Sequence, residues 1–206
     1  MSREKNSGMP PLGSAKVGAA ILGTCALLAR SNSVSVTEQR VFEKLNSGIG
    51  AAERPVWAAM QLGNGLTAVV APAAIVCSGR SKDDALRVGM AAFGGWQLAK
   101  LVKRTIPRGR PSVLLGEVVL RDGDPDGGGF VSGHATVAMA IAVTAGSIYG
   151  PPTRRAGGVA AVIVALARVH VGAHLPLDVL GGAGLGLLWG SVCSMVRAPR
   201  RSGSAA

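Results

Sequence analysis

Six apolar stretches follow one another along the chain, separated by polar connections rich in charge, glycine and proline. They cover about residues 17–29, 56–77, 85–102, 130–149, 156–171 and 175–196. Runs of about 20 apolar residues have the length of a membrane-spanning helix. The first and fifth stretches are short for a span, and tilt or extension would have to make up the difference. The pattern predicts an all-α protein, a six-helix bundle integral to a membrane.

One domain, residues 17–196, lies between two polar tails. Residues 1–16 are rich in Gly, Pro and Ser, which predicts a disordered segment, and residues 197–206 are basic and rich in small residues. Lysines precede the first apolar stretch as in a signal peptide, but no convincing small-residue cleavage site follows, so we expect a retained helix. Residues 31–54 alternate charged and apolar side chains and partly fit an amphipathic helix on the membrane surface. Their pattern assigns them no function.

Composition favours the membrane over other partners. The 206 residues are 48% hydrophobic and 16% charged, with a formal charge of +11. A soluble domain of this size has too little interior to bury several helices that are apolar all round. Basic residues also mark nucleic-acid-binding proteins, but here they cluster at the ends of apolar runs, and 3% aromatic content leaves few stacking platforms. The three cysteines are widely spaced within apolar runs, which indicates reduced residues without a disulfide framework.

The sixth apolar stretch begins with residues that could carry chemistry. Pro176 suits the first turn of a helix, and Asp178 there complements the helix dipole. Helical side chains lean toward the N-terminus, so this carboxylate would point back at His174, hold one imidazole tautomer and raise the basicity of the far nitrogen. Arg168 lies six residues before His174. Alone, the cluster fits a catalytic site or a capped helix start with a surface arginine equally well.

Two further clusters fall on the same side of a six-span bundle. Ser132, Gly133 and His134 open the fourth stretch, where a serine N-cap and neighbouring glycines let backbone N–H groups approach an anion. Lys103 and Arg110 follow the third stretch and, taken alone, would be read as snorkelling anchors at a membrane surface. Convergence of three such clusters on one face favours a functional site over three unrelated helix ends.

Together these residues form a pattern similar to the three signature motifs of the phosphatidic acid phosphatase type 2 family. The first motif is Lys103 separated by six residues from Arg110-Pro111, the second is Ser132-Gly133-His134, and the third joins Arg168, His174 and Asp178. The resemblance covers roughly residues 56–196. Val131 replaces a usual proline and Ala167 a usual serine, and the second change removes one possible hydrogen bond to phosphate.

The resemblance implies a membrane lipid phosphatase that needs no metal or cofactor. His174 would attack phosphorus, oriented by Asp178, and His134 would protonate the leaving alcohol and then activate water. The phosphate would be bound by Lys103, Arg110, Ser132, Gly133 and Arg168. The implied substrates are lipid phosphates: polyprenyl phosphates or pyrophosphates, phosphorylated polyprenyl sugars, phosphatidate and phosphatidylglycerol phosphate. A non-catalytic protein that binds or translocates lipid phosphates is the alternative.

Two metal sites compete with this interpretation. His170 and His174 have the spacing of a helical zinc pair, with Asp178 as a third ligand, although Gly172 and Pro176 interrupt a helix through both histidines. We therefore expect His170 to be a loop or packing residue. The acids Asp122, Asp124 and Asp126 imitate the start of a calcium-binding loop, but Gly133 stands where that loop needs glutamate. We expect no metal at either place.

Orientation follows from the basic residues. The two sides of the bundle carry similar numbers of Lys and Arg, and setting aside those assigned to chemistry favours cytoplasmic termini. This predicts a plasma (inner) membrane protein whose site faces the outside. The sequence does not predict an oligomeric state.

Overall fold

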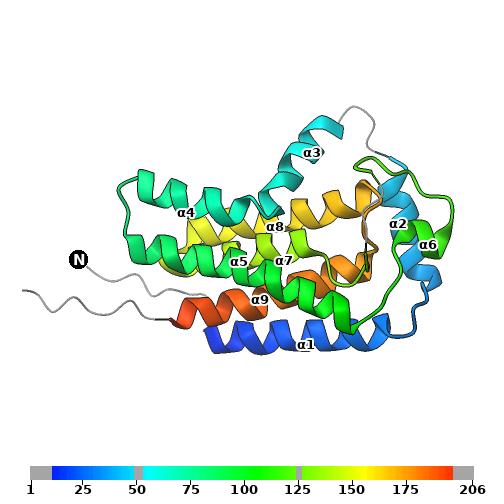
Figure 1. Cartoon of the computed structure of the whole chain (residues 1–206), viewed down its shortest axis with the longest axis horizontal. Helices are drawn as coiled ribbons and strands as arrows, with labels where there is room; N and C mark the ends of the chain where they lie inside the picture. The colour runs from blue at the N-terminus through cyan, green and yellow to red at the C-terminus, as the bar shows by residue number, and fades with distance from the viewer. Residues whose placement is uncertain (1–10, 49–52, 124–126, 197–206) are drawn as a thin grey trace, which may run out of the picture.

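The chain folds into a bundle of helices. The structure, a computed structural model, describes residues 11–48, 53–123 and 127–196, and within these ranges it contains helices and no strand (Figure 1). The prediction of an all-α fold is confirmed. In chain order the helices are α1 Pro11–Ala29, α2 Val36–Asn46, α3 Glu53–Met60, the 3-10 turn η2 Gln61–Gly63, α4 Thr67–Cys77, α5 Lys82–Thr105, α6 Pro111–Leu115, α7 Gly133–Tyr149, α8 Pro151–His170 and α9 Pro176–Met195.

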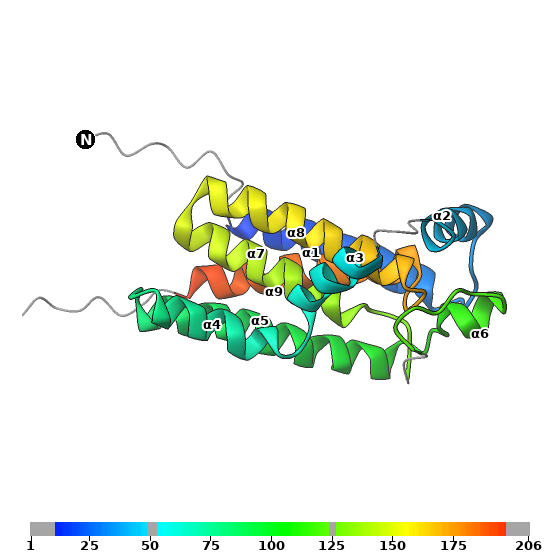
Figure 2. The ribbon, with the colours of Figure 1, turned by 90° about the horizontal axis from the view of Figure 1, so that it is seen from above.

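Helix α9 lies at the centre of the bundle, with α1 along one side and α7 along another (Figures 1 and 2). Glycines permit this packing. A methyl group built at Gly182, Gly186 or Gly190 would lie less than 3.0 Å from a backbone oxygen of α7 or of its N-cap residue. These glycines are four residues apart, so they form one smooth stripe that lets two backbones approach closely, as helices in membranes commonly do.

The helices differ in whether they are long and apolar enough to cross a membrane. By length and hydropathy α1, over Leu12–Ala29, and α9 are long and apolar enough to cross a bilayer, and α7 is apolar but shorter. The predicted span 56–77 is broken. Its two parts, Val56–Gly63 and Thr67–Cys77, meet at an angle of 84°, which makes a broken span or a re-entrant loop. Only together do they have the length of one span.

Several helices begin earlier than the apolar pattern indicated. Helix α1 starts at Pro11 and α8 at Pro151, because proline suits the first turn and polar residues are tolerated there. The predicted tail 1–16 therefore contributes its last residues to α1. Residues 1–10 and the predicted tail 197–206 lie outside the described residues.

Helix α2 lies across one end of the bundle, beside α6 and the connections that follow α5 and α8 (Figures 1 and 2). Its Phe42 is buried against Val169, Leu175 and Val179. Val36 and Val41 remain exposed. The segment that resembled a membrane-surface helix thus packs over the end of the bundle that carries the three motifs.

Candidate active site

The three motifs meet at one cavity. It has a volume of about 280 Å³ and lies between the ends of α5, α7 and α8 and the connection before α9. Of the eight predicted site residues, six line this cavity: Lys103, Arg110, Gly133, His134, Arg168 and His174. The other two, Ser132 and Asp178, lie behind it and are completely buried. Residues separated by more than 70 positions in sequence therefore face the same small space.

Two of the cations are held by backbone carbonyl groups. Lys103, in the last turn of α5, donates from Nζ to carbonyl oxygens within residues 127–129 at 2.8 and 3.3 Å. Arg110 donates from Nε to the same segment at 3.0 Å and from Nη1 to the Ala173 carbonyl at 2.8 Å. These contacts fix the heads of both side chains at the wall of the cavity.

Arg168, in the last turn of α8, has a carboxylate partner. Its Nη1 lies 2.8 Å from Asp122 Oδ2 and 2.9 Å from Met60 Sδ. Trp57 donates to the other oxygen of Asp122 at 3.3 Å. Asp122 was expected to be a solvated loop acid or part of a calcium-binding loop, and it instead pairs with a predicted phosphate clamp. Asp124 and Asp126, the other acids of that loop, lie outside the described residues.

Ser132 serves as a helix cap. Its Oγ accepts from the Ala135 N–H at 3.5 Å, and its own N–H donates to the Asp178 carbonyl at 2.9 Å. The second bond ties the start of α7 to the first turn of α9. Gly133 and His134 follow directly and face the cavity, so the N-terminus of α7 points its backbone donors there.

His174 and Asp178 lie together, as the helix start at Pro176 predicted. His174 Nδ1 is 3.7 Å from Asp178 Oδ2, which also accepts from the Leu175 N–H at 2.9 Å as part of a capping box. A distance of 3.7 Å is too long for a hydrogen bond, so the imidazole lies beside the carboxylate without being bonded to it. The turn before His174 depends on Gly172, whose φ of +80° favours glycine.

The surroundings of His174 favour its neutral form. Burial, followed by the positive charges of Lys103, Arg168 and Arg110, lowers the pKa of His174 well below its ordinary value. A neutral imidazole whose Nδ1 faces a carboxylate leaves Nε2 as the nucleophilic nitrogen.

Arg108 belongs to none of the three motifs, and the sequence did not predict its contact with Asp178. This residue is one of the largest completely buried side chains, and its Nη1 donates to Asp178 Oδ1 at 2.9 Å. Burial would lower the pKa of Arg108, but its hydrogen bond to Glu38 and the charge of Asp178 outweigh burial and raise it. Removing one partner of such a buried pair costs about 3–5 kcal/mol. Its position between Lys103 and Arg110 was the only signal in the sequence, and it did not distinguish Arg108 from an exposed basic residue.

His170 lies outside the cavity. Its ring Nδ1 is 2.9 Å from the Leu45 carbonyl and its side chain is buried, as expected for a packing residue. Within the described ranges, no three His, Cys, Asp or Glu side chains gather so that they could hold a metal ion.

The two residues that differ from the family's motif pattern, Ala167 and Val131, are both buried among apolar side chains. Ala167 is buried in a cluster with Met60, Val171 and Ala173, under the Met60 side chain that contacts Arg168. Val131 is buried in another apolar cluster next to the start of α7.

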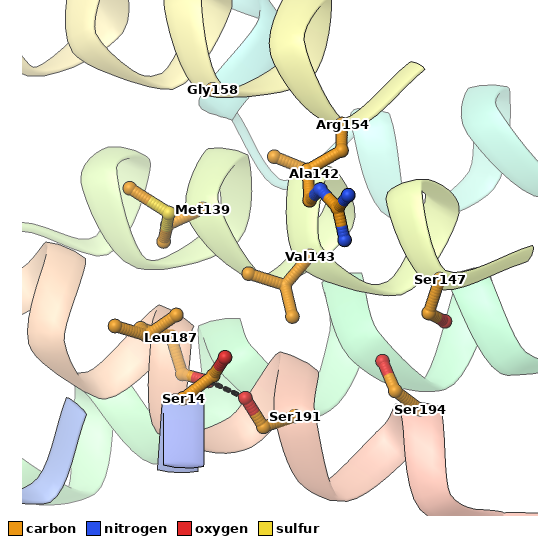
Figure 3. Close-up of a pocket in the computed structure, with 10 residues that line it drawn as sticks. All are labelled: Ser14, Met139, Ala142, Val143, Ser147, Arg154, Gly158, Leu187, Ser191 and Ser194. Atoms are coloured by element: carbon orange, nitrogen blue, oxygen red, sulfur yellow. Dashed lines mark hydrogen bonds between the residues drawn. The ribbon is translucent and has the colours of Figure 1, made fainter. Parts of the chain in front are cut away.

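A second cavity, of about 230 Å³, lies at the opposite end of the bundle (Figure 3). Arg154 and four serines line it among apolar side chains. Three of the hydroxyl groups donate to carbonyls of their own helices at 2.7 Å: Ser147, Ser191 and Ser194. It holds no pair of base and nucleophile.

Comparisons with known proteins agree with this geometry. A sequence model of the PAP2 superfamily matches residues 85–202, which include all three motifs. The decaprenylphosphoryl-5-phosphoribose phosphatase of Mycobacterium tuberculosis (strain CDC 1551 / Oshkosh) is 31% identical over 125 residues, 59% of this chain and 66% of that protein. The protein of the same name from Mycolicibacterium smegmatis is 35% identical over 97 residues, 47% and 51% of the two chains. The chain thus spans less than two thirds of the length of these relatives.

Two solved structures share the fold. The first, a transmembrane PAP2 type phosphatidylglycerolphosphate phosphatase from Bacillus subtilis, has a TM-score of 0.67 at 21% identity, covering 86% of this chain and 94% of that one. The second, LpxE from Aquifex aeolicus, has a TM-score of 0.66 at 24% identity, covering 75% and 93%.

Proposed function

Because the chain belongs to the PAP2 superfamily, we propose that it is a membrane lipid phosphatase that hydrolyses a phosphomonoester or pyrophosphate of a lipid. The observation that carries the proposal is the cavity itself, where three cations face a paired His174 and a second histidine, His134. Among the candidate lipids, a phosphorylated polyprenyl sugar is favoured, because the relatives compared above are named for such a substrate.

The cations would stabilise the transferring phosphoryl group. Phosphoryl transfer spreads negative charge over three equatorial oxygens, so catalysis depends on positioned positive charges and N–H donors. Lys103, Arg110 and Arg168 supply the charges, and the N–H groups at the start of α7 supply the donors. The arginines can each bind two oxygens.

The histidines would carry the covalent steps. His174 Nε2 attacks phosphorus, the bond to the leaving alcohol breaks, and a phosphohistidine forms while Asp178 stabilises the imidazolium. His134 gives its proton to the alcohol oxygen, then takes one from the water that attacks the phosphohistidine. Water therefore supplies the hydroxyl of inorganic phosphate, and both histidines return to their starting forms.

An apolar groove supports a lipid substrate. It has a volume of about 320 Å³ and runs between α4, α7 and α8. Ala138 in its wall lies one helical turn after His134, and Val164 lies one turn before Arg168. A hydrocarbon chain in this groove would bring its phosphate to the cations.

The alternative is a protein that binds or translocates lipid phosphates without turnover. Binding needs only the cations. It gives no reason for His174 to be held beside a buried Asp178 while His134 faces the same cavity.

Comparison of two buried histidines tests the proposal. We expect His174→Ala to reduce phosphate release from a polyprenyl phosphate in detergent by at least about 10⁴-fold. His170→Ala, four residues away, removes a packing contact and should keep its turnover per folded molecule. Wild-type protein given a 32P-labelled substrate and quenched in alkali should retain acid-labile label. Turnover by folded His174→Ala would refute the mechanism.

A chelator distinguishes this chemistry from the zinc interpretation. We expect full activity in excess EDTA, since side chains supply the positive charge. Loss of activity that zinc restores would assign His170, His174 and Asp178 to a metal. A panel of lipid phosphates assayed with the same protein would then identify the substrate.

The protein is an integral membrane protein, and we propose that its site faces the outside of the plasma membrane. The start of α1 and the end of α9 lie at the end of the bundle opposite the site (Figure 1). That end also carries several basic side chains, as cytoplasmic ends usually do: Arg80, Lys82, Arg87, Arg154 and Arg155. Cys77, exposed at the end of α4, provides a test. A membrane-impermeant maleimide should label it only after cells are lysed.

A further inference from the structure

We propose that Glu38 and Arg108 are positioning residues that hold Asp178 in place against His174. This inference rests on the proposed function, because the placement of Asp178 matters to turnover only if His174 reacts. It also gives a role to α2, which no motif includes.

The two carboxylate oxygens of Asp178 have different partners, and Arg108 binds one of them. Arg108 Nη1 donates to Oδ1 at 2.9 Å, so this oxygen faces the guanidinium. Oδ2 is left for the Leu175 N–H at 2.9 Å and for His174 Nδ1 at 3.7 Å. Because both oxygens are held, the carboxylate cannot rotate away from the imidazole without breaking a buried bond.

Glu38 fixes the arginine in turn. Its Oε2 accepts from Arg108 Nη2 at 2.7 Å and its Oε1 from Nη1 at 3.2 Å, a two-pronged contact. The same Oε1 accepts from the Leu177 N–H at 2.9 Å, in the first turn of α9. Glu38 therefore binds both the arginine and the helix that carries Asp178.

The charges in this group favour a negative Asp178. One guanidinium lies between two carboxylates, and the Arg108 and Asp178 side chains are both completely buried. Arg108 favours the ionised form of Asp178, and the charge of Glu38 offsets part of the positive potential that Arg108 creates there. Without Glu38, the positive potential at Asp178 and His174 would be larger.

Helix α2 is capped at its start and tied to other segments at its end, which limits movement of Glu38. Ser35 caps its start by accepting from the Glu38 N–H at 3.2 Å. At its other end Asn46 donates to the carbonyls of Val119 and His170, both at 2.9 Å. These contacts hold α2 across the end of the bundle that carries the site.

Substitutions on one helix test the proposal with a matched control. Glu38→Gln keeps the size of the side chain and removes its charge. Glu43→Gln makes the same change on α2, where Glu43 accepts from Gln39 on the exposed surface. In full-length purified protein, we expect Glu38→Gln to lower kcat about 10- to 100-fold with KM changed less than about twofold, as for residues that orient a reacting group. Glu43→Gln should leave both unchanged.

Two more measurements separate positioning from a general effect on folding. In a single turnover, Glu38→Gln should slow formation of the phosphohistidine more than its hydrolysis, because Asp178 acts on the attacking imidazole. Arg108→Lys keeps the charge but loses the two-pronged contact, and should lower kcat similarly. The double variant should be no slower than the slower single variant, since both changes break one chain of contacts.

Several results would overturn the proposal. An unchanged kcat per folded molecule in Glu38→Gln would make the network structural only, whatever its thermal stability. A raised KM with normal kcat would assign Glu38 to substrate binding. If Arg108→Lys does not fold, Glu38→Gln and its control still decide. Failure of the proposed function itself is distinguishable, because His174→Ala would then keep its activity.

Discussion

The bundle has a cavity at each end, and the two differ in the polar side chains that line them and in where those side chains bind. At the far end, serine hydroxyls donate to carbonyls of their own helices (Figure 3). At the site end, side chains bind partners on other elements: Lys103 reaches residues 127–129, Arg168 reaches Asp122, and Arg108 reaches Glu38. A chemically active cavity needs charged and nucleophilic groups that face one space. Of these two cavities, the one at the site end brings Lys103, Arg110 and Arg168 together with two histidines.

The site end also has more buried polar side-chain atoms that form no hydrogen bond. Buried nitrogens and oxygens are nearly always hydrogen-bonded, so exceptions point to function. Of the six such side-chain atoms within the described residues, four are at the site end: Arg108 Nε, Arg168 Nε, His170 Nε2 and His174 Nδ1. Burial of several charges there costs stability that apolar packing elsewhere must offset.

The largest effect in this comparison is expected from Lys103→Gln. In the proposed mechanism Lys103 is a preorganised cation that binds the transferring phosphate, so its removal should lower kcat/KM about 10²- to 10³-fold. Arg104→Gln, which changes the exposed next residue of the same helix, should alter kcat/KM less than twofold. Equal losses in both variants would mean that Lys103 acts as a general surface charge.

The same pair of variants makes a prediction about pH. Burial and then the Lys103 charge depress the pKa of His174, so the acid limb of kcat/KM should lie below pH 6.5 in the wild type. Without Lys103 the protonated imidazole is less repelled and its pKa rises. The acid limb should therefore move to higher pH in Lys103→Gln and stay in place in Arg104→Gln. A limb that moves to lower pH would contradict this assignment.

A smaller effect is expected from Asp122→Asn. Asp122 pairs with Arg168, so it would compete with a phosphate bound there, and its side chain is 30% exposed. A partly exposed ion pair contributes up to about 1 kcal/mol, which corresponds to about fivefold in binding. Inorganic phosphate should therefore inhibit Asp122→Asn at about fivefold lower concentration than wild type. Weaker inhibition would instead show that Asp122 holds Arg168 in its binding position.

Motif spacing predicted that these residues would lie together, and six of the eight line one cavity because they sit at or near helix ends. A helix terminus fixes where the adjacent side chains point, so Lys103, His134 and Arg168 could be placed on one face from the spans alone. The partners Glu38 and Asp122 could not be predicted in this way. Each is a single acid in a connection or surface helix, at least 46 positions from the residue it contacts.

The bend between η2 and α4 is a second feature that the apolar pattern did not predict. Residues 56–77 are mostly apolar, and hydropathy does not distinguish a straight span from one bent by 84°. Gly63, Asn64 and Gly65 at the bend were a local signal. Two of them, Gly63 and Gly65, line the site cavity, so the break brings backbone to the wall of that cavity.

The smallest effect is expected from Arg154→Gln, at the cavity of the far end. The Arg154 stem packs on Gly146, where an added methyl group would lie 2.6 Å from its Cβ, and its head lines the serine cavity (Figure 3). This cavity lies at the other end of the same helices, α7 and α8, that carry His134 and Arg168. Loss of one interfacial charge should change stability by about 0.5 kcal/mol or less and kcat/KM by less than twofold. A tenfold loss of kcat/KM in folded protein would show that α7 and α8 couple the two ends, and the site could then no longer be described by its own contacts alone.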